Sequence, residues 1–549
     1  MPNCTQCKKS FLIDDRDRVF YKKMDVPEPT LCPEDRLRRR VAWTNEMNLY
    51  PRKCDMTGED MLSMYPAGVK FPVYKSGNWF KDTWDAREYG RDVDFSRPFF
   101  EQWAELRDVV PHYSRLVLES TLVNSDYINF SSGAKNCYLI FDSDRNEECY
   151  YSYTLQDCKD VVDCRRVRES QLCYECIDCR KCYNCRYLQD SQNCTDCYFV
   201  YSSNSLLNCF GCVNLHRKQY CWFNEQLSKE EYEKRLVAID FGSSKQVEQW
   251  AQKFEEHKKK FPRLDMNGSN NQDSYGDYLL NCKNARDCFD SYGVEDGRYC
   301  YGTFLPIKDA YDTYQVGEDC SLLYDTGLGG FSCYNIKFSW GIFEGGSDIE
   351  YSQHCRASKN LFGCVGMRKG EYCILNKQYS KEEFFALREK LIAHMKKTGE
   401  WGEYFPIVYS PFAYNKSNGD LELPLSKEEA LQRGFRWDDS DRAWKPSTMD
   451  VPENIEDVSD DIMQALLADK DTGQNYKIIK QELEFYRKQG IPVPLNCFME
   501  RHKKRQAKRN PRVLYDRTCD KCGAAIKTTY APESGFKIYC RACFLKEVT

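Results

Sequence analysis

The chain has 549 residues, a formal net charge of −5 and 30% charged residues, which excludes the global basic field of a protein that wraps nucleic acid over its whole surface. Its 31 cysteines are an odd number, so complete pairing within one chain is excluded as well. The first residues lack the basic and apolar regions of a signal peptide, and no apolar run reaches the roughly 18 residues of a membrane span. We therefore expect a cytoplasmic protein without membrane contact, whose thiols are free or bound to metal.

The two ends of the chain match each other without a gap at an offset of 465 residues. Matching pairs include Phe20 with Phe485, Pro27 with Pro492, Cys32 with Cys497, Arg36 with Arg501, Arg40 with Arg505, Cys54 with Cys519, and Gly58 with Gly523. So many coincidences predict a duplicated module. Laid over each other, the copies suggest a module with two metal sites, of which each copy has kept one.

The C-terminal copy keeps a complete set of four cysteines, namely Cys519, Cys522, Cys540 and Cys543. Two Cys-x-x-Cys knuckles separated by 17 residues are typical of a zinc ribbon, because Zn²⁺ prefers four tetrahedral thiolates and each knuckle supplies two from a tight turn. A site closed by four protein ligands predicts a structural zinc and not a catalytic one. Unligated thiols and a redox-active pair are the alternatives.

The N-terminal copy keeps the other site, with Cys4, Cys7 and Cys32. Its fourth ligand is open between Asp35, Cys54 and water. Both copies carry remnants of a lost site: Thr57, Lys75 and Asn78 beside Cys54, and Asp469, Thr472 and Glu500 around Cys497. We therefore expect one or two zinc ions per chain.

Cysteines also recur at intervals of 21 residues in the middle of the chain, as in Cys137, Cys158 and Cys179, and the equivalent positions are otherwise Val, Leu or Ile. A period near 20 residues with recurring small apolar positions is typical of a β-solenoid, in which equivalent side chains stack inside each turn. The Cys-x-x-Cys spacing is here interpreted as the period of the coil wall. A metal cluster or metal store is the alternative, and a disulfide framework is less expected.

A second block repeats this arrangement, because Phe210-Gly-Cys212-Val recurs as Phe362-Gly-Cys364-Val. Capping boxes at Ser228 and Ser380 open amphipathic helices that can cover the last coil of each block. The predicted fold is mainly β, a parallel β-helix of about 21-residue coils in two tandem blocks with capping helices and flanking zinc-ribbon modules. The predicted segments are an N-terminal zinc module (1–80), a connection (81–134), the first block (135–262), the second block (263–414), an acidic linker (415–468) and a C-terminal zinc-ribbon module (469–549).

Several strings resemble a family of uncharacterised bacterial proteins with zinc-ribbon ends around a cysteine-rich β-solenoid repeat. They begin at Pro29, Arg39, Asp94 and Tyr515 and read Pro-Thr-Leu-Cys-Pro, Arg-Arg-Val-Ala-Trp-Thr-Asn-Glu, Asp-Phe-Ser-Arg-Pro-Phe-Phe-Glu and Tyr-Asp-Arg-Thr-Cys-Asp-Lys-Cys-Gly. The likeness covers nearly the whole chain and implies the same architecture without implying an activity. Within the family the first site resembles a full four-cysteine set, from which Asp35 departs.

No catalytic motif stands out, because none of the six histidines lies in a His-Glu-x-x-His arrangement and no Walker phosphate loop occurs. Asp142, Asp144 and Glu147 resemble the grouped carboxylates of polysaccharide enzymes with this fold, but acidic bends are also common. We therefore expect no enzyme, with a β-helix enzyme acting on a polymer as an alternative.

Basic residues gather beside the zinc sites, at Arg36, Arg38, Arg39 and Arg40 in the first module and at Arg501, Lys503, Lys504, Arg505, Lys508 and Arg509 in the second. Such stretches can contact phosphates with salt-sensitive affinity. A solvated charged face and contact with an acidic protein surface, including the chain's own acidic linker, are the alternatives. The sequence thus predicts a non-enzymatic scaffold that binds nucleic acid or a ribonucleoprotein, with a protein partner or metal storage as further readings.

Overall fold

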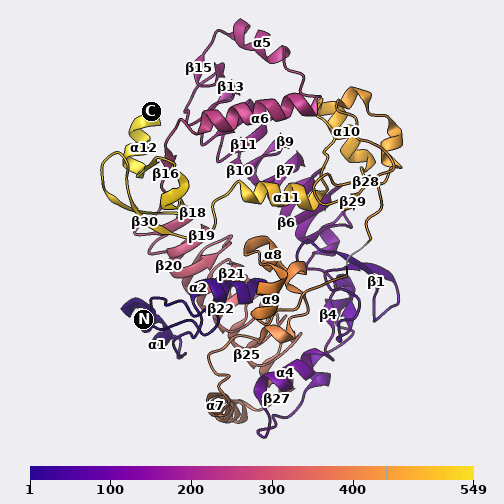
Figure 1. Cartoon of the computed structure of the whole chain (residues 1–549). Helices are drawn as coiled ribbons and strands as arrows, with labels where there is room; N and C mark the ends of the chain where they lie inside the picture. The colour runs from indigo at the N-terminus through magenta and orange to yellow at the C-terminus, as the bar shows by residue number, and fades with distance from the viewer. Residues whose placement is uncertain (441–442, 549) are drawn as a thin grey trace.

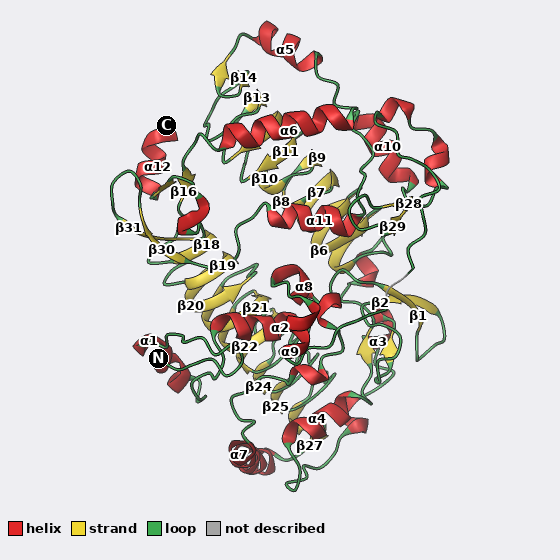
Figure 2. Cartoon of the chain, in the orientation of Figure 1, coloured by secondary structure: helices red, strands yellow, loops and turns green. Residues whose placement is uncertain are grey.

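The computed structural model describes residues 1–440 and 443–548. Two stacks of short parallel strands form its centre, and helices and small hairpins surround them (Figures 1 and 2). None of the helices in these ranges is long and apolar enough to cross a lipid bilayer. The predicted fold class, mainly β with a parallel β-solenoid, is confirmed.

The two stacks are the first and second solenoid blocks. The first comprises β5 (Asn129–Lys135), β6 (Tyr138–Glu147), β7 (Tyr150–Val162), β8 (Arg165–Arg168), β9 (Gln171–Tyr174), β10 (Ile177–Arg180), β11 (Arg186–Gln189), β12 (Thr195–Tyr201), β13 (Leu207–Phe210), β14 (Cys221–Trp222) and β15 (Glu225–Gln226). The second comprises β17 (Gly268–Ser269), β18 (Tyr275–Leu280), β19 (Arg286–Tyr292), β20 (Val294–Tyr301), β21 (Ile307–Gly317), β22 (Cys320–Gly330), β23 (Tyr334–Lys337), β24 (Ser347–Glu350), β25 (Lys359–Phe362), β26 (Glu371–Ile374) and β27 (Lys377–Gln378).

The coil length differs from the prediction. Residues that face each other on successive coils lie 12 apart in the first block, as Cys197 and Cys209 do, and 13 apart in the middle of the second, as Ile307 and Cys320 do. The expected 21-residue coil is therefore wrong. The reason is that every third residue points inward. Because 21 and 12 are both multiples of three, residues 21 apart both point inward, but they lie on different walls of the coil.

Left-handed backbone at every third residue makes this narrow coil possible. Asp157, Asp160, Asp163 and Arg166, for example, all have φ between 53° and 55°. Asn and Asp adopt this conformation more easily than most residues because their short polar side chains bond locally. Asn136 and Asp178 share the same conformation.

Cysteine fills the interior as a small apolar residue. On one wall of the first block, successive coils contribute Cys173, Cys185, Cys197, Cys209 and Cys221, each at most 2% exposed. The thiol of Cys173 donates to the carbonyl of Gln171 at 3.4 Å, and the hydroxyl of Ser170 donates to Arg168 in the same way at 2.8 Å. Thiol and hydroxyl therefore serve the same local role, and the Cys-x-x-Cys spacing is that of the coil wall.

A helix follows each block, as expected. α5 (Lys229–Val237) and α7 (Lys381–Thr398) lie at opposite ends of the molecule, because the two blocks run in opposite directions (Figure 1). Tyr232 of α5 is 1% exposed and its ring lies 6.1 Å from that of Trp222, whereas Phe384 of α7 packs 5.9 Å from Tyr372. A further helix, α6 (Ser244–Lys258), runs along the first block.

The two ends of the chain contain helices and strands at corresponding positions, 465 residues apart. The N-terminal module contains α1 (Asp15–Lys23), α2 (Pro33–Val41), β1 (Tyr50–Lys53), β2 (Asp60–Ser63), β3 (Val73–Tyr74) and α3 (Ser76–Trp79). The C-terminal module contains β28 (Leu467–Ala468), β29 (Asn475–Tyr476), α10 (Lys480–Gln489), α11 (Phe498–Ala507), β30 (Tyr515–Thr518), β31 (Ala525–Thr528), β32 (Ile538–Tyr539) and α12 (Arg541–Val548). Tyr50 pairs with Ser63 and Tyr515 with Thr528, so the hairpins coincide at the predicted offset.

Each module also pairs with the strand that leads into a block. β3 runs parallel to β4 (His112–Tyr113), just before the first block, and β32 runs parallel to β16 (Arg263–Leu264), just before the second. Between the module and β4 lies α4 (Phe99–Arg107). The segment predicted as an acidic linker contains α8 (Asn418–Glu422) and α9 (Lys427–Gln432), and it buries Ala430 and Ile462 completely.

Candidate metal centres

The four C-terminal cysteines come together as the knuckle pattern predicts. Cys519 and Cys522 lie on the turn after β30, Cys540 follows β32, and Cys543 lies in α12. Their four sulfur atoms lie within 4.8 Å of one another. Burial opposes ionisation of Cys519, but N–H groups of Cys540 and neighbouring residues outweigh it and lower its pKa to about 6. A thiolate is the form that binds a metal ion, and Cys519 favours it, whereas the neighbouring thiol of Cys522 and burial raise the pKa of Cys543 to about 12.

The N-terminal group consists of Cys4, Cys7, Cys32 and Asp35, whose ligand atoms also lie within 4.8 Å of one another. Asp35 Oδ2 lies 3.2 Å from the sulfur of Cys4. Among the three ligands left open by the sequence, Asp35 joins the group. Cys54 instead accepts the N–H of Lys75 at 3.3 Å. Two groups that can hold a metal ion are therefore present.

Asp35 is held in place from its other side. Its Oδ1 accepts hydrogen bonds from Arg38 at 2.7 Å and from Arg433 at 2.6 Å, so Oδ2 remains directed at the thiols. Arg433 follows α9, which ties the metal group to the segment after the second block. A cavity of about 480 Å³ borders Asp35 on the same side and includes Gln6 and Glu403 in its lining.

In the lost site of the N-terminal module, the three side chains that replace cysteines all bind one carboxylate. Thr57, Lys75 and Asn78 occupy the positions of Cys522, Cys540 and Cys543. All three donate to the carboxylate of Glu59, at 3.0, 3.0 and 2.8 Å respectively. The carboxylate of Glu59 thus takes the place that a metal ion would have in a complete four-cysteine site. The sequence comparison missed Glu59, because it lies outside the four ligand positions.

Asp469 has the same role in the lost site of the C-terminal module, where it replaces the first cysteine. Its carboxylate accepts the N–H groups of Thr472 at 2.9 Å and Cys497 at 2.7 Å. Burial raises its pKa, but the backbone N–H groups more than compensate and lower the pKa to about 2. Each module therefore has one group of potential metal ligands and one hydrogen-bonded carboxylate centre.

The basic stretch of the first module turns inward instead of facing solvent. Arg36 contacts Asp312 of the second block at 2.9 Å, and Arg40 contacts Asp312 at 3.2 Å and Asp325 at 2.7 Å. Arg36 and Arg40 are 2% and 0% exposed. Arg39 also binds Asp325, at 2.5 Å. The two carboxylates lie on adjacent coils, so this helix is clamped across one coil step.

The second module repeats the clamp on the first block. Arg501 and Arg505, which correspond to Arg36 and Arg40, contact Asp163, and Arg505 also contacts Glu175 at 2.6 Å. Asp163 and Glu175 are 12 residues apart, again one coil step. Each module therefore binds the flank of one block while its last strand pairs at the entrance to the other.

These contacts correct the predicted nucleic-acid site. Seven of its ten members pair within the chain and have side chains at most 11% exposed, so they are not available to phosphates, namely Arg36, Arg38, Arg39, Arg40, Arg501, Arg505 and Arg509. Lys503 and Lys504 also pair, with Glu500 and Asp471, but their side chains remain exposed, as does that of Lys508. The carboxylates that bind Arg36, Arg40, Arg501 and Arg505 belong to the solenoid and not to the acidic linker that the sequence suggested. The i, i+4 spacing of Arg36 and Arg40 was the available signal, since it places both on one helix face.

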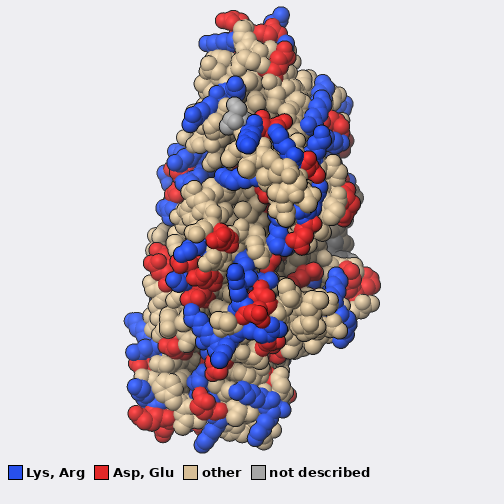
Figure 3. Space-filling model, turned by 90° about the vertical axis from the view of Figure 1, so that its left-hand side faces the viewer, with Lys and Arg blue, Asp and Glu red and all other residues tan. Residues whose placement is uncertain are grey.

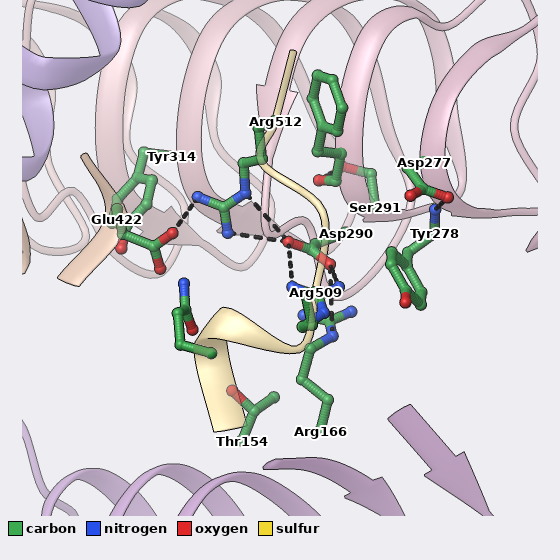
Figure 4. Close-up of polar contacts among 12 residues, drawn as sticks. Thr154, Arg166, Asp277, Tyr278, Asp290, Ser291, Tyr314, Glu422, Arg509 and Arg512 are labelled. Carbon is green, nitrogen blue, oxygen red and sulfur yellow. Dashed lines mark hydrogen bonds and ion pairs between the residues drawn. The ribbon is translucent and has the colours of Figure 1, made fainter. Parts of the chain in front are cut away.

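Asp290 joins both blocks and the C-terminal module, as Figure 4 shows. It contacts Arg509 at 2.5 Å, Arg512 at 2.8 Å and Arg166 of the first block at 3.5 Å. Burial opposes its charge, but the three arginines more than compensate and hold its pKa well below the usual range. Arg512 also binds Glu422 of α8, at 2.5 Å.

Other carboxyls near this junction have raised pKa values. Burial raises the pKa of Asp190 and of Asp277 to about 7, although Asp190 accepts a hydrogen bond from Tyr278 at 2.7 Å. Burial likewise raises the pKa of Asp142 to about 6. The carboxylates of Asp144 and Glu147, considered with Asp142 from the sequence, instead pair on the surface with Arg145 and Lys135.

Charges of both signs are interspersed over the face that carries the chain termini, with no separate basic field (Figure 3).

No family model and no curated protein matches the chain. Among solved structures, it is similar to a protein from Desulfovibrio desulfuricans G20 designated an acetyltransferase, with 9% identity over 48% of this chain and 69% of that one. The TM-score is 0.11, so this likeness carries no argument.

Proposed function

We propose that this chain is a non-enzymatic scaffold held together by two zinc ions, one in each terminal module. The observation that carries the proposal is the distribution of ligands. Each module has one four-ligand group and one centre in which a carboxylate takes over. Thiolate-rich tetrahedral groups favour Zn²⁺ over hard cations, and four protein ligands leave no open position for a substrate.

The scaffold reading follows from what the modules do. Arg40 binds the second block, whereas β3 of the same module pairs with the strand that leads into the first block. Arg505 binds the first block, whereas β32 of its module pairs with the strand that leads into the second block. A zinc ion in each module would therefore stabilise the arrangement of both blocks. Buried thiols such as Cys197 donate to backbone carbonyls, which supports a structural role for them and argues against a metal store.

Metal analysis of the purified chain tests this proposal. We expect about two zinc ions per chain, and about one after Cys519→Ser or Cys4→Ser. Cys54→Ser is the matched control, because Cys54 is also buried in a module but lies outside both groups. Zinc far above two per chain would support storage, and zinc below one would overturn the proposal.

Contact with nucleic acid or a ribonucleoprotein is a second candidate, favoured only by the exposed lysines Lys503, Lys504 and Lys508 on and just after α11. With three cations, the logarithm of the affinity should fall with that of the salt concentration at a slope near −2 to −3. The triple Lys→Gln variant should abolish binding. A partner recovered from cells in a nuclease-resistant complex would instead favour a protein-interaction scaffold.

A further inference from the structure

A second cavity, of about 430 Å³, lies beside α4, and its lining contains no residue of either metal group. Three parts of the chain line it: the turn 66–71 of the first module, one face of α4, and the segment 408–411 together with Arg436. Cavities of roughly 300–1,000 Å³ are typical of sites for small organic ligands. Nothing described so far uses this space.

Two guanidinium groups meet at this cavity. Arg107, at the end of α4, donates to the carbonyl of Tyr409, and Arg436 donates to the carbonyl of Ser410. The two carbonyls belong to consecutive residues, and both arginines line the cavity. Arg436 is anchored by its own backbone, whose carbonyl accepts the N–H of Tyr414 at 2.8 Å. The preceding residue, Phe435, is buried against Tyr414.

The charges around the cavity do not balance. Its lining contains four cations, Lys70, Arg97, Arg107 and Arg436, and three carboxylates, Glu101, Glu105 and Asp108. The carboxylates already have partners: Arg97 binds both glutamates, and Asp108 lies 2.6 Å from Arg107 and 3.7 Å from Lys70.

Arg436 is the cation left over, since no ion pair joins it to a carboxylate within residues 1–440 and 443–548. Burial and the neighbouring charge of Arg107 lower its pKa, which is the signature of a positive charge without a counter-charge. A bound anion would supply that counter-charge and accept charge-assisted hydrogen bonds from both groups.

We infer that this cavity binds a small phosphate compound, whose phosphate group lies between Arg436 and Arg107. Guanidinium groups match the geometry of phosphate oxygens, and two of them line this cavity. The rest of the lining includes Phe71, Val69 and Tyr409, which suits a small apolar or aromatic body attached to the phosphate. The site is independent of the zinc proposal, because none of its residues belongs to a metal group.

Calorimetric titration of the full metal-loaded chain in chloride buffer tests the inference, with inorganic phosphate and phenyl phosphate as probes. We expect saturable binding of one phosphate per chain and a loss of affinity of about tenfold or more in Arg436→Gln, since hydrogen bonds to charged groups contribute roughly 1.5–3 kcal/mol. Tighter binding of phenyl phosphate would identify an ester as the ligand, and equal binding would identify the free anion. Absence of saturable binding to both probes would overturn the inference.

Arg356→Gln is the matched control, because Arg356 is a half-buried arginine of the second block that pairs with Glu344 and lies outside the cavity. Its binding should equal that of the unmodified chain. Equal losses in both variants would also contradict the inference.

A second measurement needs no substitution. Phenylglyoxal modification of the unmodified chain, mapped by mass spectrometry, should be slowed at Arg436 by added phosphate and unchanged at Arg356. This outcome can be read even if Arg436→Gln fails to fold. Unchanged modification of Arg436 at saturating phosphate would refute the site.

Discussion

The clamp between the first module and the second block makes a sharp prediction for Arg40→Ala. Arg40 is 0% exposed and contacts Asp312 and Asp325, which are 0% and 1% exposed in their side chains. Removing one partner of a buried ion pair leaves charge without compensation and costs about 3–5 kcal/mol. Arg505→Ala should cost a similar amount, because Arg505 has the equivalent position in the other module.

Urea unfolding of the metal-loaded chain, followed by tryptophan fluorescence, measures this loss, since the buried Trp43 lies just after α2 and reports on the module. The matched control is Arg18→Ala. Arg18 also forms ion pairs, with Asp15 and Glu28, but its side chain is 52% exposed, and such pairs contribute at most about 1 kcal/mol. If Arg40→Ala destabilised the chain no more than Arg18→Ala, the clamp would not be a source of stability and the reasoning would be refuted.

Three further predictions concern metal, pH and the solenoid core. Chelation of zinc should lower the melting temperature of the unmodified chain, and it should lower that of Cys519→Ser by less; equal shifts would contradict two independent sites. Because the folded pKa values of Asp190 and Asp277 are raised from 3.8 to about 7, the folded state holds protons that the unfolded state has lost. The stability that these two carboxyls contribute is complete below about pH 4 and is lost as the pH rises through 7. The urea midpoint should therefore decrease as the pH is raised from 5 to 8, and it should decrease less steeply in Asp190→Asn. Cys197→Ala should cost about 1–2 kcal/mol in urea unfolding without loss of zinc, whereas loss of zinc would show that solenoid thiols bind metal.

Part of this architecture could be predicted because it depends on local patterns. The knuckles around Cys519 and Cys540 and the offset between the modules require only residue types at fixed spacings. The inward cysteines were also recognisable, but a register of 21 residues and one of 12 select the same inward positions, so the coil length stayed hidden. Pairing of strands, which the sequence does not display, decides between them.

Whether the basic stretches face solvent or the solenoid could not be predicted from the sequence for a different reason. A run such as Arg38-Arg39-Arg40 has the same composition on a solvated face and in a clamp. Its counter-charges lie far away in the chain, with Asp312 276 residues from Arg36. Asp312 itself looks like an ordinary acidic bend, because left-handed bends favour aspartate throughout the solenoid. Only the folded arrangement of module and block distinguishes the two interpretations.

The lost metal sites explain how two copies of one module can keep the same fold although each has kept a different group of potential metal ligands. A knuckle directs backbone N–H groups at its centre, and in the C-terminal group the sulfur of Cys519 accepts the N–H of Cys540 at 3.2 Å. In the first module Cys54 accepts the corresponding N–H of Lys75, and Glu59 collects the remaining donors. Asp469 does the same for its own turn. The turn therefore requires a negative centre and not a metal as such, because buried N–H groups need an acceptor of either kind. A thiolate cluster supplies that centre only when a cation offsets its charge, whereas a single carboxylate surrounded by donors supplies it alone, so the same turn can form with either.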